Sequence, residues 1–250
     1  CGCPAFIADP VVVDEFQLKS RVSGVPGIKR ESIFHALNQK AVARRYAKSI
    51  GKKYEELNLI VVHLGGGISV GAHRKGLVID VNNALNGEGP ISPERAGTVP
   101  SEALATLCFS GKYTLNEVKK MLHGKAGLAA YLGTSDMITI EEKAIEGKEP
   151  YKTLVAAMDY TVAKEIGAMF VALKGQCDAI ILTGGIAYSD YCVSDIKEQI
   201  EYLCKVVVLP GENEMESLAE NAFGALTGEL PVLTYTGVSC AEEIPGMAEA

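Results

Sequence analysis

Apolar positions along the chain repeat with two periods, which predict strands and helices in alternation. The helical period is clearest at 153–174, where one face carries only large apolar side chains and Gly175 stands at the expected end. Helices are also predicted at 31–50, which lacks Gly and Pro, and at 189–203. Shorter helices are expected at 101–108 and at 114–122, and one follows Pro210-Gly211 with Met215, Leu218, Ala219, Ala222 and Leu226 on one side.

Short continuous apolar runs predict strands that are buried on both faces. They lie at 5–8, 59–61 (within the predicted hairpin stretch 59–70), 77–81, 179–182 and 206–209. The basic turn 73–76 separates two of these runs, so an antiparallel hairpin is expected there. The last two runs each lead through glycine into a predicted helix. Hairpin and β-turn-α units together indicate an α/β fold with a mixed sheet flanked by helices, and ligands collect at the strand ends of such sheets.

Composition narrows the possible partners. The 250 residues are 48% hydrophobic and carry a formal net charge of -7, without a block of Lys and Arg. Nucleic acid is therefore not expected as a partner, because binding its backbone requires clustered positive charge. No apolar run approaches the roughly 20 residues that span a bilayer, so no membrane association is expected and a cytoplasmic location is the default. The seven scattered cysteines lack the C-x-x-C spacing of a zinc site.

A glycine turn carries the strongest chemical signal in the chain. His63-Leu64-Gly65-Gly66-Gly67 follows the apolar run Leu59-Ile60-Val61. Three consecutive glycines let backbone N–H groups approach a phosphate, which a Cβ would obstruct. A strand rather than a helix is predicted after the turn, which argues against a Rossmann or Walker site and an NAD-dependent enzyme. A glycine-rich hairpin without any ligand remains the alternative at this point.

These residues resemble the second signature of the acetate and butyrate kinase family. The match runs from Leu59 to Gly76, and the Gly-Gly-Gly version is similar to the butyrate kinase branch. Further blocks agree in order and spacing and extend the resemblance over residues 4–228. They are Phe6-Ile7-Ala8-Asp9-Pro10, Arg30 through His35, Pro93-Glu94-Arg95-Ala96-Gly97, Gly133-Thr134-Ser135-Asp136, Thr183-Gly184-Gly185-Ile186 and Gly211-Glu212-Asn213-Glu214.

The resemblance implies a ribonuclease-H-like sheet of the actin and sugar-kinase type, in which most of this chain forms the C-terminal lobe of a two-lobe kinase. The family's first phosphate signature is absent and the chain opens in an apolar run, so an N-terminally truncated piece is expected. Residues 1–12 would be a remnant of the N-terminal lobe and 13–212 the nucleotide-binding lobe. Residues 213–230 would return to the N-terminal lobe as a helix, and 231–250 would form an irregular tail. The family also suggests a homodimer.

The implied reaction transfers a phosphoryl group in line from ATP to a short-chain carboxylate, with Mg²⁺ as cofactor. Arg95 and His35 would stabilise the transferring group, since the reacting partners are both anionic. The turn from His63 to Gly67, Leu64 included, would hold phosphate. Asp9 would act as the catalytic aspartate and, with Glu214, address the metal.

Two softer segments match those that hold adenosine in the family, Asp136-Met137-Ile138 and Gly184-Gly185-Ile186-Ala187-Tyr188-Ser189. The second departs from the family's Gly-Ile-Gly-Glu-Asn, which weakens its ribose and base contacts. A non-catalytic nucleotide sensor or assembly module of the same superfamily remains the alternative, because fold alone does not determine function.

Overall fold

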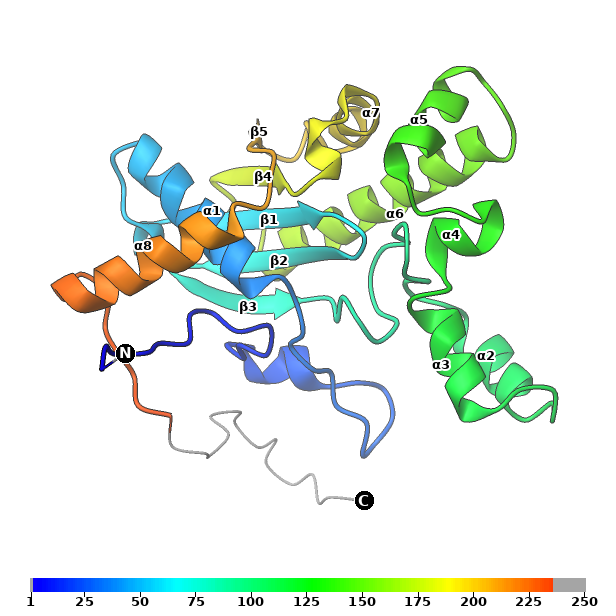
Figure 1. The fold of residues 1–250 in the computed structure, drawn as a ribbon, viewed down its shortest axis with the longest axis horizontal. Coiled ribbons are helices and arrows are strands. Elements are labelled where there is room, and N and C mark those ends of the chain that lie inside the picture. Colours follow the sequence, from blue (N-terminus) through cyan, green and yellow to red (C-terminus); the bar gives the residue numbers. More distant parts are fainter. Residues whose placement is uncertain (1, 236–250) are drawn as a thin grey trace.

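The computed structural model describes residues 2–235, which build one five-stranded mixed sheet in the order β3-β2-β1-β4-β5 (Figure 1). The first three strands, β1 (Asn58–Leu64), β2 (Ile68–Arg74) and β3 (Leu77–Val81), form an antiparallel meander. The other two, β4 (Ala179–Thr183) and β5 (Val206–Val208), run parallel to β1. The predicted combination of a hairpin with β-turn-α units is confirmed.

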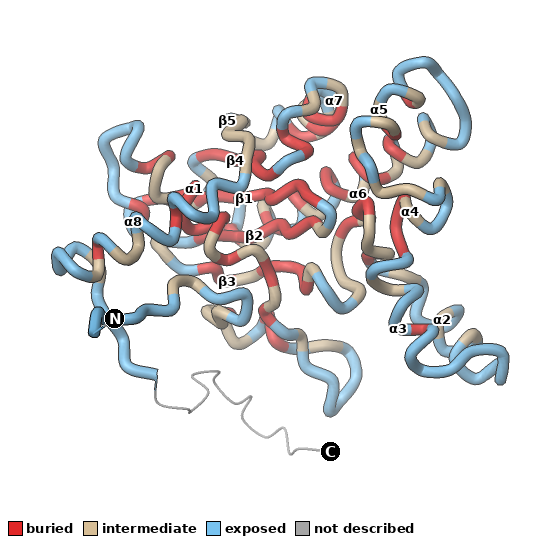
Figure 2. The backbone as a smooth tube through the Cα atoms, in the orientation of Figure 1, coloured by how far each residue is buried: buried red, intermediate tan, exposed pale blue. Residues whose placement is uncertain are grey.

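Helices cover both faces of this sheet. On one face lie α6 (Tyr151–Ala172) and α7 (Asp190–Ile200), and on the other lies α1 (Ala36–Ser49), against which α8 (Glu214–Thr227) packs. Alternate residues of β1 divide between the two cores: Leu59 and Val61 face α1, whereas Ile60 and Val62 face α6 and α7. Because both faces are covered, the central residues Leu59–Val62 are all apolar, and Figure 2 shows the strand as buried.

Four shorter helices follow β3 and extend beyond the sheet. They are α2 (Ser101–Cys108), α3 (Leu115–Leu122), α4 (Gly127–Leu132) and α5 (Met137–Ile145). Helix α2 has no buried residue, and α2 and α3 project as a largely exposed pair (Figure 2). In the described part of the chain, three 3-10 turns complete the elements: η1 (Leu18–Arg21), η2 (Tyr54–Glu56) and η3 (Ile186–Tyr188). Among residues 2–235, no helix combines the length and the hydrophobicity needed to cross a bilayer.

Several predicted elements are confirmed closely. The helix predicted at 153–174 is α6, and its stripe is buried: Val155, Met158, Val162, Ile166, Met169 and Leu173. The helix predicted at 114–122 is α3, where the Thr114 hydroxyl accepts from the Glu117 N–H and the Glu117 carboxylate accepts from the Thr114 N–H. The strands at 77–81, 179–182 and 206–209 appear within one residue of the expected ends.

Other predictions were wrong in ways that have a physical cause. Residues 5–8 form no strand, because no neighbouring strand pairs with them among the described residues, and Ile7 is 87% exposed. Helix α1 begins at Ala36 rather than Glu31, since the N–H of Phe34 is bonded to Val11. Helix α7 ends at Ile200 rather than 203. Helices α4 and α5 were not predicted, since the turn at 133–136 separates two short segments of little periodicity.

Helix α8 turns its apolar stripe outward. Met215 is 80% exposed and Leu226 65% exposed. Its inner side is polar instead, and the buried Ser217 hydroxyl accepts a hydrogen bond of 2.9 Å from Arg45 of α1. Of the predicted irregular tail, 231–235 lack regular structure and 236–250 lie outside the described residues.

One acid lies inside the core between α6 and α7. Asp159 has no exposed surface, and neither of its carboxylate oxygens has a hydrogen-bond partner in the described structure. Burial, together with the nearby carboxylates of Asp195 and Glu141, raises the pKa of Asp159 to about 8. The fold therefore holds a proton on Asp159 that the unfolded chain releases above pH 4.

Replacing Asp159 by Asn should stabilise the protein increasingly as the pH rises. A folded pKa above the unfolded one gives stability that is complete near pH 4 and is lost on the way to pH 8. The neutral amide imitates the protonated acid, so the variant should match the wild type near pH 4 and exceed it by several kcal/mol near pH 8, at about 1.4 kcal/mol per unit of pKa displacement. Urea unfolding at both pH values measures the difference, with Asp190→Asn, an exposed site on α7, as control. An equal gap at both pH values would contradict the protonated state.

Candidate active site at the ends of β1 and β4

The glycine turn lies where the carboxyl ends of two parallel strands meet. Strand β1 ends at Leu64 and β2 begins at Ile68, so Gly65–Gly67 forms the tip of the hairpin. The parallel register sets His63 opposite Thr183 of β4. Gly184 follows with a φ of +90°, and a Cβ there would lie 2.4 Å from the Leu64 carbonyl oxygen. The predicted segments 63–67 and 184–189 are therefore neighbours, and only glycine fits at position 184.

Two histidines stack at the base of this turn. His35, at the N-terminal boundary of α1, and His63, near the end of β1, have ring centroids 3.8 Å apart and an interplanar angle of 14°. The Nδ1 of His35 lies 2.8 Å from the Ser69 hydroxyl, and that of His63 lies 2.9 Å from Oδ1 of Asn38. Burial lowers the pKa of His35 to about 4 and that of His63 to about 3, and Arg95 also disfavours the cation at His35. Both rings are neutral at pH 7.

Arg95 reaches the same turn from the loop that follows β3. The Ser92 hydroxyl and the Glu94 N–H donate to the Gly66 carbonyl, at 2.7 and 3.1 Å. A Cβ built on Gly67 would lie 3.8 Å from both Arg95 Nε and His35 Cε1. Arg95 Nε is buried without a hydrogen-bond partner in the described structure, and its nearest carboxylate, Glu94, lies 4.0 Å from Nη1. The site thus presents a cation with unused donors beside bare backbone.

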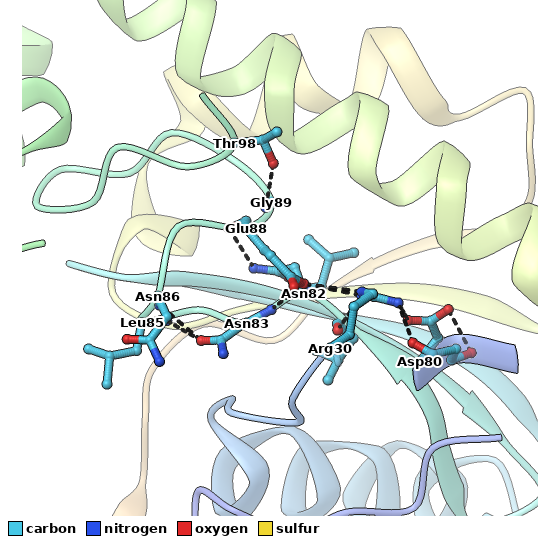
Figure 3. Close-up of polar contacts among 12 residues, drawn as sticks. Arg30, Asp80, Asn82, Asn83, Leu85, Asn86, Glu88, Gly89 and Thr98 are labelled. Carbon is cyan, nitrogen blue, oxygen red and sulfur yellow. Dashed lines mark hydrogen bonds and ion pairs between the residues drawn. The ribbon is translucent and has the colours of Figure 1, made fainter. Parts of the chain in front are cut away.

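A polar network holds the root of that loop (Figure 3). Arg30 donates to Asp80 at 2.8 Å and to Glu88 at 3.3 Å. Asn82 accepts from the Val70 N–H and donates to the Ile68 carbonyl, which ties the loop to β2. Since this network spans from the segment before α1 to β3, the loop leaves the sheet in a fixed direction.

The tip of the loop is held from the other side by α4. A Cβ on Gly127, whose φ is +59°, would lie 1.9 Å from the Ser92 carbonyl oxygen, so only glycine allows this approach. The Ser135 hydroxyl donates to Glu94 at 3.2 Å, which joins the segment 133–136 to the rim of the turn. Asp136 then caps α5, and its bond from the Thr139 hydroxyl lowers the pKa of its carboxyl. In this predicted adenosine segment, Asp136–Ile138, the side chain of Ile138 is 73% exposed.

Two predicted residues do not join this group. Asp9 accepts a hydrogen bond of 2.7 Å from Arg44, halfway along α1, and lies 4.0 Å from Lys40. Glu214 is exposed in the first turn of α8. The described residues contain no group of three or more His, Cys, Asp or Glu side chains placed to hold a metal.

The structure adds residues that were not predicted. Glu212, two positions before Glu214, has its carboxylate 3.7 Å from His63 Nε2. Asn38 donates to the Glu212 carbonyl at 2.9 Å. Ser69 contacts His35, and all three residues lie within or beside the quoted motifs. The available signal was local: Asn38 lies three positions after His35 on a helix, so both share a face.

This geometry suits an anion. Arg95, the neutral His35 and a side-chain-free turn meet at Gly67, and within residues 2–235 the buried Nε of Arg95 has no hydrogen-bond partner. Unused donors in a partly dry site interact strongly with phosphate oxygens. Of the predicted residues, the structure therefore brings together His35, His63, Gly65–Gly67 and Arg95, and the segment Gly184–Ser189 begins beside them, where Gly184 packs on Leu64.

Comparison with known proteins agrees with this arrangement. The model of the acetokinase family matches residues 14–223. A probable butyrate kinase of Phocaeicola vulgatus is 71% identical over 235 residues, which cover 94% of this chain and 66% of the relative. A probable butyrate kinase of Bacteroides thetaiotaomicron is 57% identical over 93% of this chain and 66% of its own length. The chain thus spans just under two thirds of these relatives.

Solved structures share the fold at low sequence identity. The acetate kinase of Porphyromonas gingivalis superimposes with a TM-score of 0.76 at 21% identity, over 86% of this chain and 62% of the other. A propionate kinase of Francisella tularensis gives a TM-score of 0.72 at 20% identity, over 81% and 59%. The predicted fold of the actin and sugar-kinase type is confirmed, and the chain belongs to the acetokinase family.

Proposed function

We propose that this chain is the nucleotide-binding lobe of a kinase that phosphorylates a short-chain carboxylate, butyrate or a branched analogue, with ATP. The observation that carries the proposal is the buried Nε of Arg95, which has no partner among residues 2–235 and lies beside Gly67 and the neutral His35. The relatives named probable butyrate kinases support the choice of acceptor. The reaction would yield ADP and an acyl phosphate by direct in-line transfer.

The main barrier to this reaction is electrostatic. A carboxylate is already a nucleophile, but it must approach a phosphoryl group that is also negative. Arg95 supplies a planar fork of donors for the equatorial oxygens, and a lysine lacks that geometry. His35 adds a neutral hydrogen-bond donor, and the amides of Gly65–Gly67 receive the remaining phosphate oxygens.

Mg²⁺ enters the proposal as the ion that accompanies ATP and lowers the charge on its phosphates. The proposed ligands fit it only in part, because Asp9 is engaged by Arg44 whereas Glu214 stands exposed on α8. We therefore assign no step of the transfer to the metal. Asp9 is retained as the proposed catalytic aspartate, which would have to exchange its bond to Arg44 for one to the substrates.

Adenosine would lie between the two softer segments. Gly184–Ser189 follows β4 beside the glycine turn, and Tyr188 is 71% exposed there, with its hydroxyl near Gly211. Asp136–Ile138 approaches from the side of Glu94 through Ser135. An exposed tyrosine offers a ring on which an adenine base can stack. We also propose that residues 13–212 form the nucleotide-binding lobe and that 1–12 and 213–230 belong with an N-terminal lobe. A homodimer is the proposed working assembly.

Replacing Arg95 by Ala should lower kcat by roughly 10²- to 10³-fold, the usual loss when one donor to a transition-state oxyanion is removed. The Kd for ATP should rise far less, because the glycine turn is intact. The assay uses the whole protein, with any sequence that extends beyond these residues, and traps acyl phosphate from butyrate as the hydroxamate. Arg95→Lys should recover little of the loss, and Arg74→Ala, at the exposed end of β2, serves as control.

Equal losses in turnover and ATP affinity, or no loss, would contradict the role of Arg95. A protein that binds ATP but gives no hydroxamate with acetate, propionate, butyrate or isobutyrate would favour the non-catalytic alternative.

Replacing Gly67 by Val should weaken ATP binding to this chain by at least tenfold, with little change in Tm. The φ of Gly67 is accessible to other residues, and a Cβ meets its nearest atom only at 3.5 Å, so the fold tolerates it. The added methyl groups would fill the space between Arg95 and His35. Calorimetric titration with ATP measures the change, and Gly24→Val, in an open loop, is the matched control. Unchanged affinity would show that phosphate binds elsewhere.

A further inference from the structure

A series of hydrogen-bonded, buried side chains runs from Tyr54, which follows α1 in the sequence, to His35 at the candidate site. Tyr54 of η2 lies 2.6 Å from His73 Nδ1, and His73 Nε2 lies 2.9 Å from Oε1 of Gln39. The amide nitrogen of Gln39 lies 2.8 Å from the Ser69 hydroxyl, which is 2.8 Å from His35 Nδ1. Gln39, Ser69 and His73 have no exposed surface.

The direction of these hydrogen bonds follows from one backbone group. The nitrogen of the Gln39 side chain also lies 3.1 Å from the Ser69 carbonyl oxygen, which only accepts. Gln39 must therefore turn its NH₂ to Ser69 and its oxygen to His73, so His73 carries its proton on Nε2. Burial lowers the pKa of His73 to about 3, which keeps the ring neutral and leaves Nδ1 to accept from the Tyr54 hydroxyl.

The same reasoning extends to His35. The Ser69 hydroxyl oxygen accepts from Gln39, and His35 Nδ1 is the only acceptor within hydrogen-bond distance of its proton among residues 2–235. Ser69 therefore donates to Nδ1, and the proton of the neutral His35 ring lies on Nε2. That nitrogen adjoins Cε1, the ring atom nearest to Gly67.

His63 has the opposite arrangement. Asn38 donates from Nδ2 to the Glu212 carbonyl at 2.9 Å, so its Oδ1 must accept from His63. The His63 proton therefore lies on Nδ1. The stacked rings are two different tautomers, each set by an amide that a backbone carbonyl orients.

We propose that Tyr54, His73, Gln39 and Ser69 are positioning residues that hold His35 as a neutral Nε2–H donor facing the phosphoryl site. Gly71 leaves the space that the Gln39–His73 hydrogen bond occupies, because a Cβ there would lie 2.4 Å from Gln39 Oε1 and 3.0 Å from His73 Nε2. The meaning for catalysis rests on the proposed function, whereas the tautomers can be measured without any substrate.

Long-range ¹H–¹⁵N correlation spectra of the 250-residue chain test the tautomers directly, since it has only four histidines. At pH 7, we expect His35 and His73 protonated on Nε2 and His63 on Nδ1, with all three rings neutral. Lowering the pH should leave His35 neutral until about pH 4. Protonation of His35 on Nδ1, or a cationic ring at pH 7, would overturn the proposal in the wild-type protein.

The variant Gln39→Glu should reverse the direction of the hydrogen bonds that join position 39, Ser69 and His35. A carboxylate at position 39 accepts from the Ser69 hydroxyl instead of donating to it, so Ser69 must accept from His35 and the ring proton moves to Nδ1. Gln176→Glu, the same change at an exposed site, should leave all tautomers as they are. An unchanged His35 in a folded Gln39→Glu protein, with the introduced carboxyl shown to be ionised by its ¹³C chemical shift, would overturn the inference.

Ser69→Ala gives a second arm if Gln39→Glu does not fold. Without the hydroxyl, His35 should become a mixture of tautomers, and a ring that stays wholly on Nε2 would overturn the role of Ser69. In the whole protein, Gln39→Glu should lower kcat roughly 10²-fold with little change in the KM for ATP. A reversed tautomer with normal turnover would overturn the positioning role and leave the proposed kinase activity standing.

Discussion

The carbonyl oxygen of Gly66 accepts two hydrogen bonds from the loop after β3, and the shape of the site depends on them. A Cβ on Gly66 would lie 3.3 Å from the Glu94 carboxylate, so the bare turn leaves room for this loop. The bonds fix the loop immediately before Arg95, which carries the guanidinium to within contact of Gly67. Glycine thus serves the site twice, by leaving room for a ligand and by giving the cationic loop a place to bind.

The positive charge of Arg95 is only weakly compensated at the site. Arg95 has a buried nitrogen without a partner in the described structure, and the two histidines beside it are held neutral, His35 by burial and by that positive charge and His63 by burial. Burying a donor without a partner costs about 1–3 kcal/mol. Such a cost persists in a fold when the donor meets its partner in another state, and here an anion above Gly67 would satisfy it.

The parts of the fold that follow from local rules were predictable. Both-face burial makes the central residues of β1 and β4 all apolar, and the stripe of α6 repeats with a helical period, so both appeared in the sequence. Elements that depend on partners were not. Residues 5–8 have strand composition without a neighbouring strand among the described residues, and the stripe of α8 lies outward, because polar contacts to Arg44 and Arg45 hold its other side.

The site shows the same division between what local motifs predict and what depends on partners. The signature motifs predicted His35, His63, Arg95 and the glycine turn, which the fold brings together. Motifs carry no information on which carboxylate approaches a histidine, so Glu212, 3.7 Å from His63, was missed. Asp9 is separated from the predicted group by its bond to Arg44.

A neutral histidine is a sensible donor in this setting for an energetic reason. A protonated His35 would stack against His63 and face Arg95, so it would add a second desolvated cation with no carboxylate in contact among the described residues. A neutral ring avoids that cost but can present either a proton or a lone pair. The buried amide of Gln39 removes this ambiguity, because the Ser69 carbonyl permits only one orientation. Backbone geometry, rather than a nearby charge, then determines which ring nitrogen of His35 carries the proton. This position of the proton does not vary with pH in the physiological range.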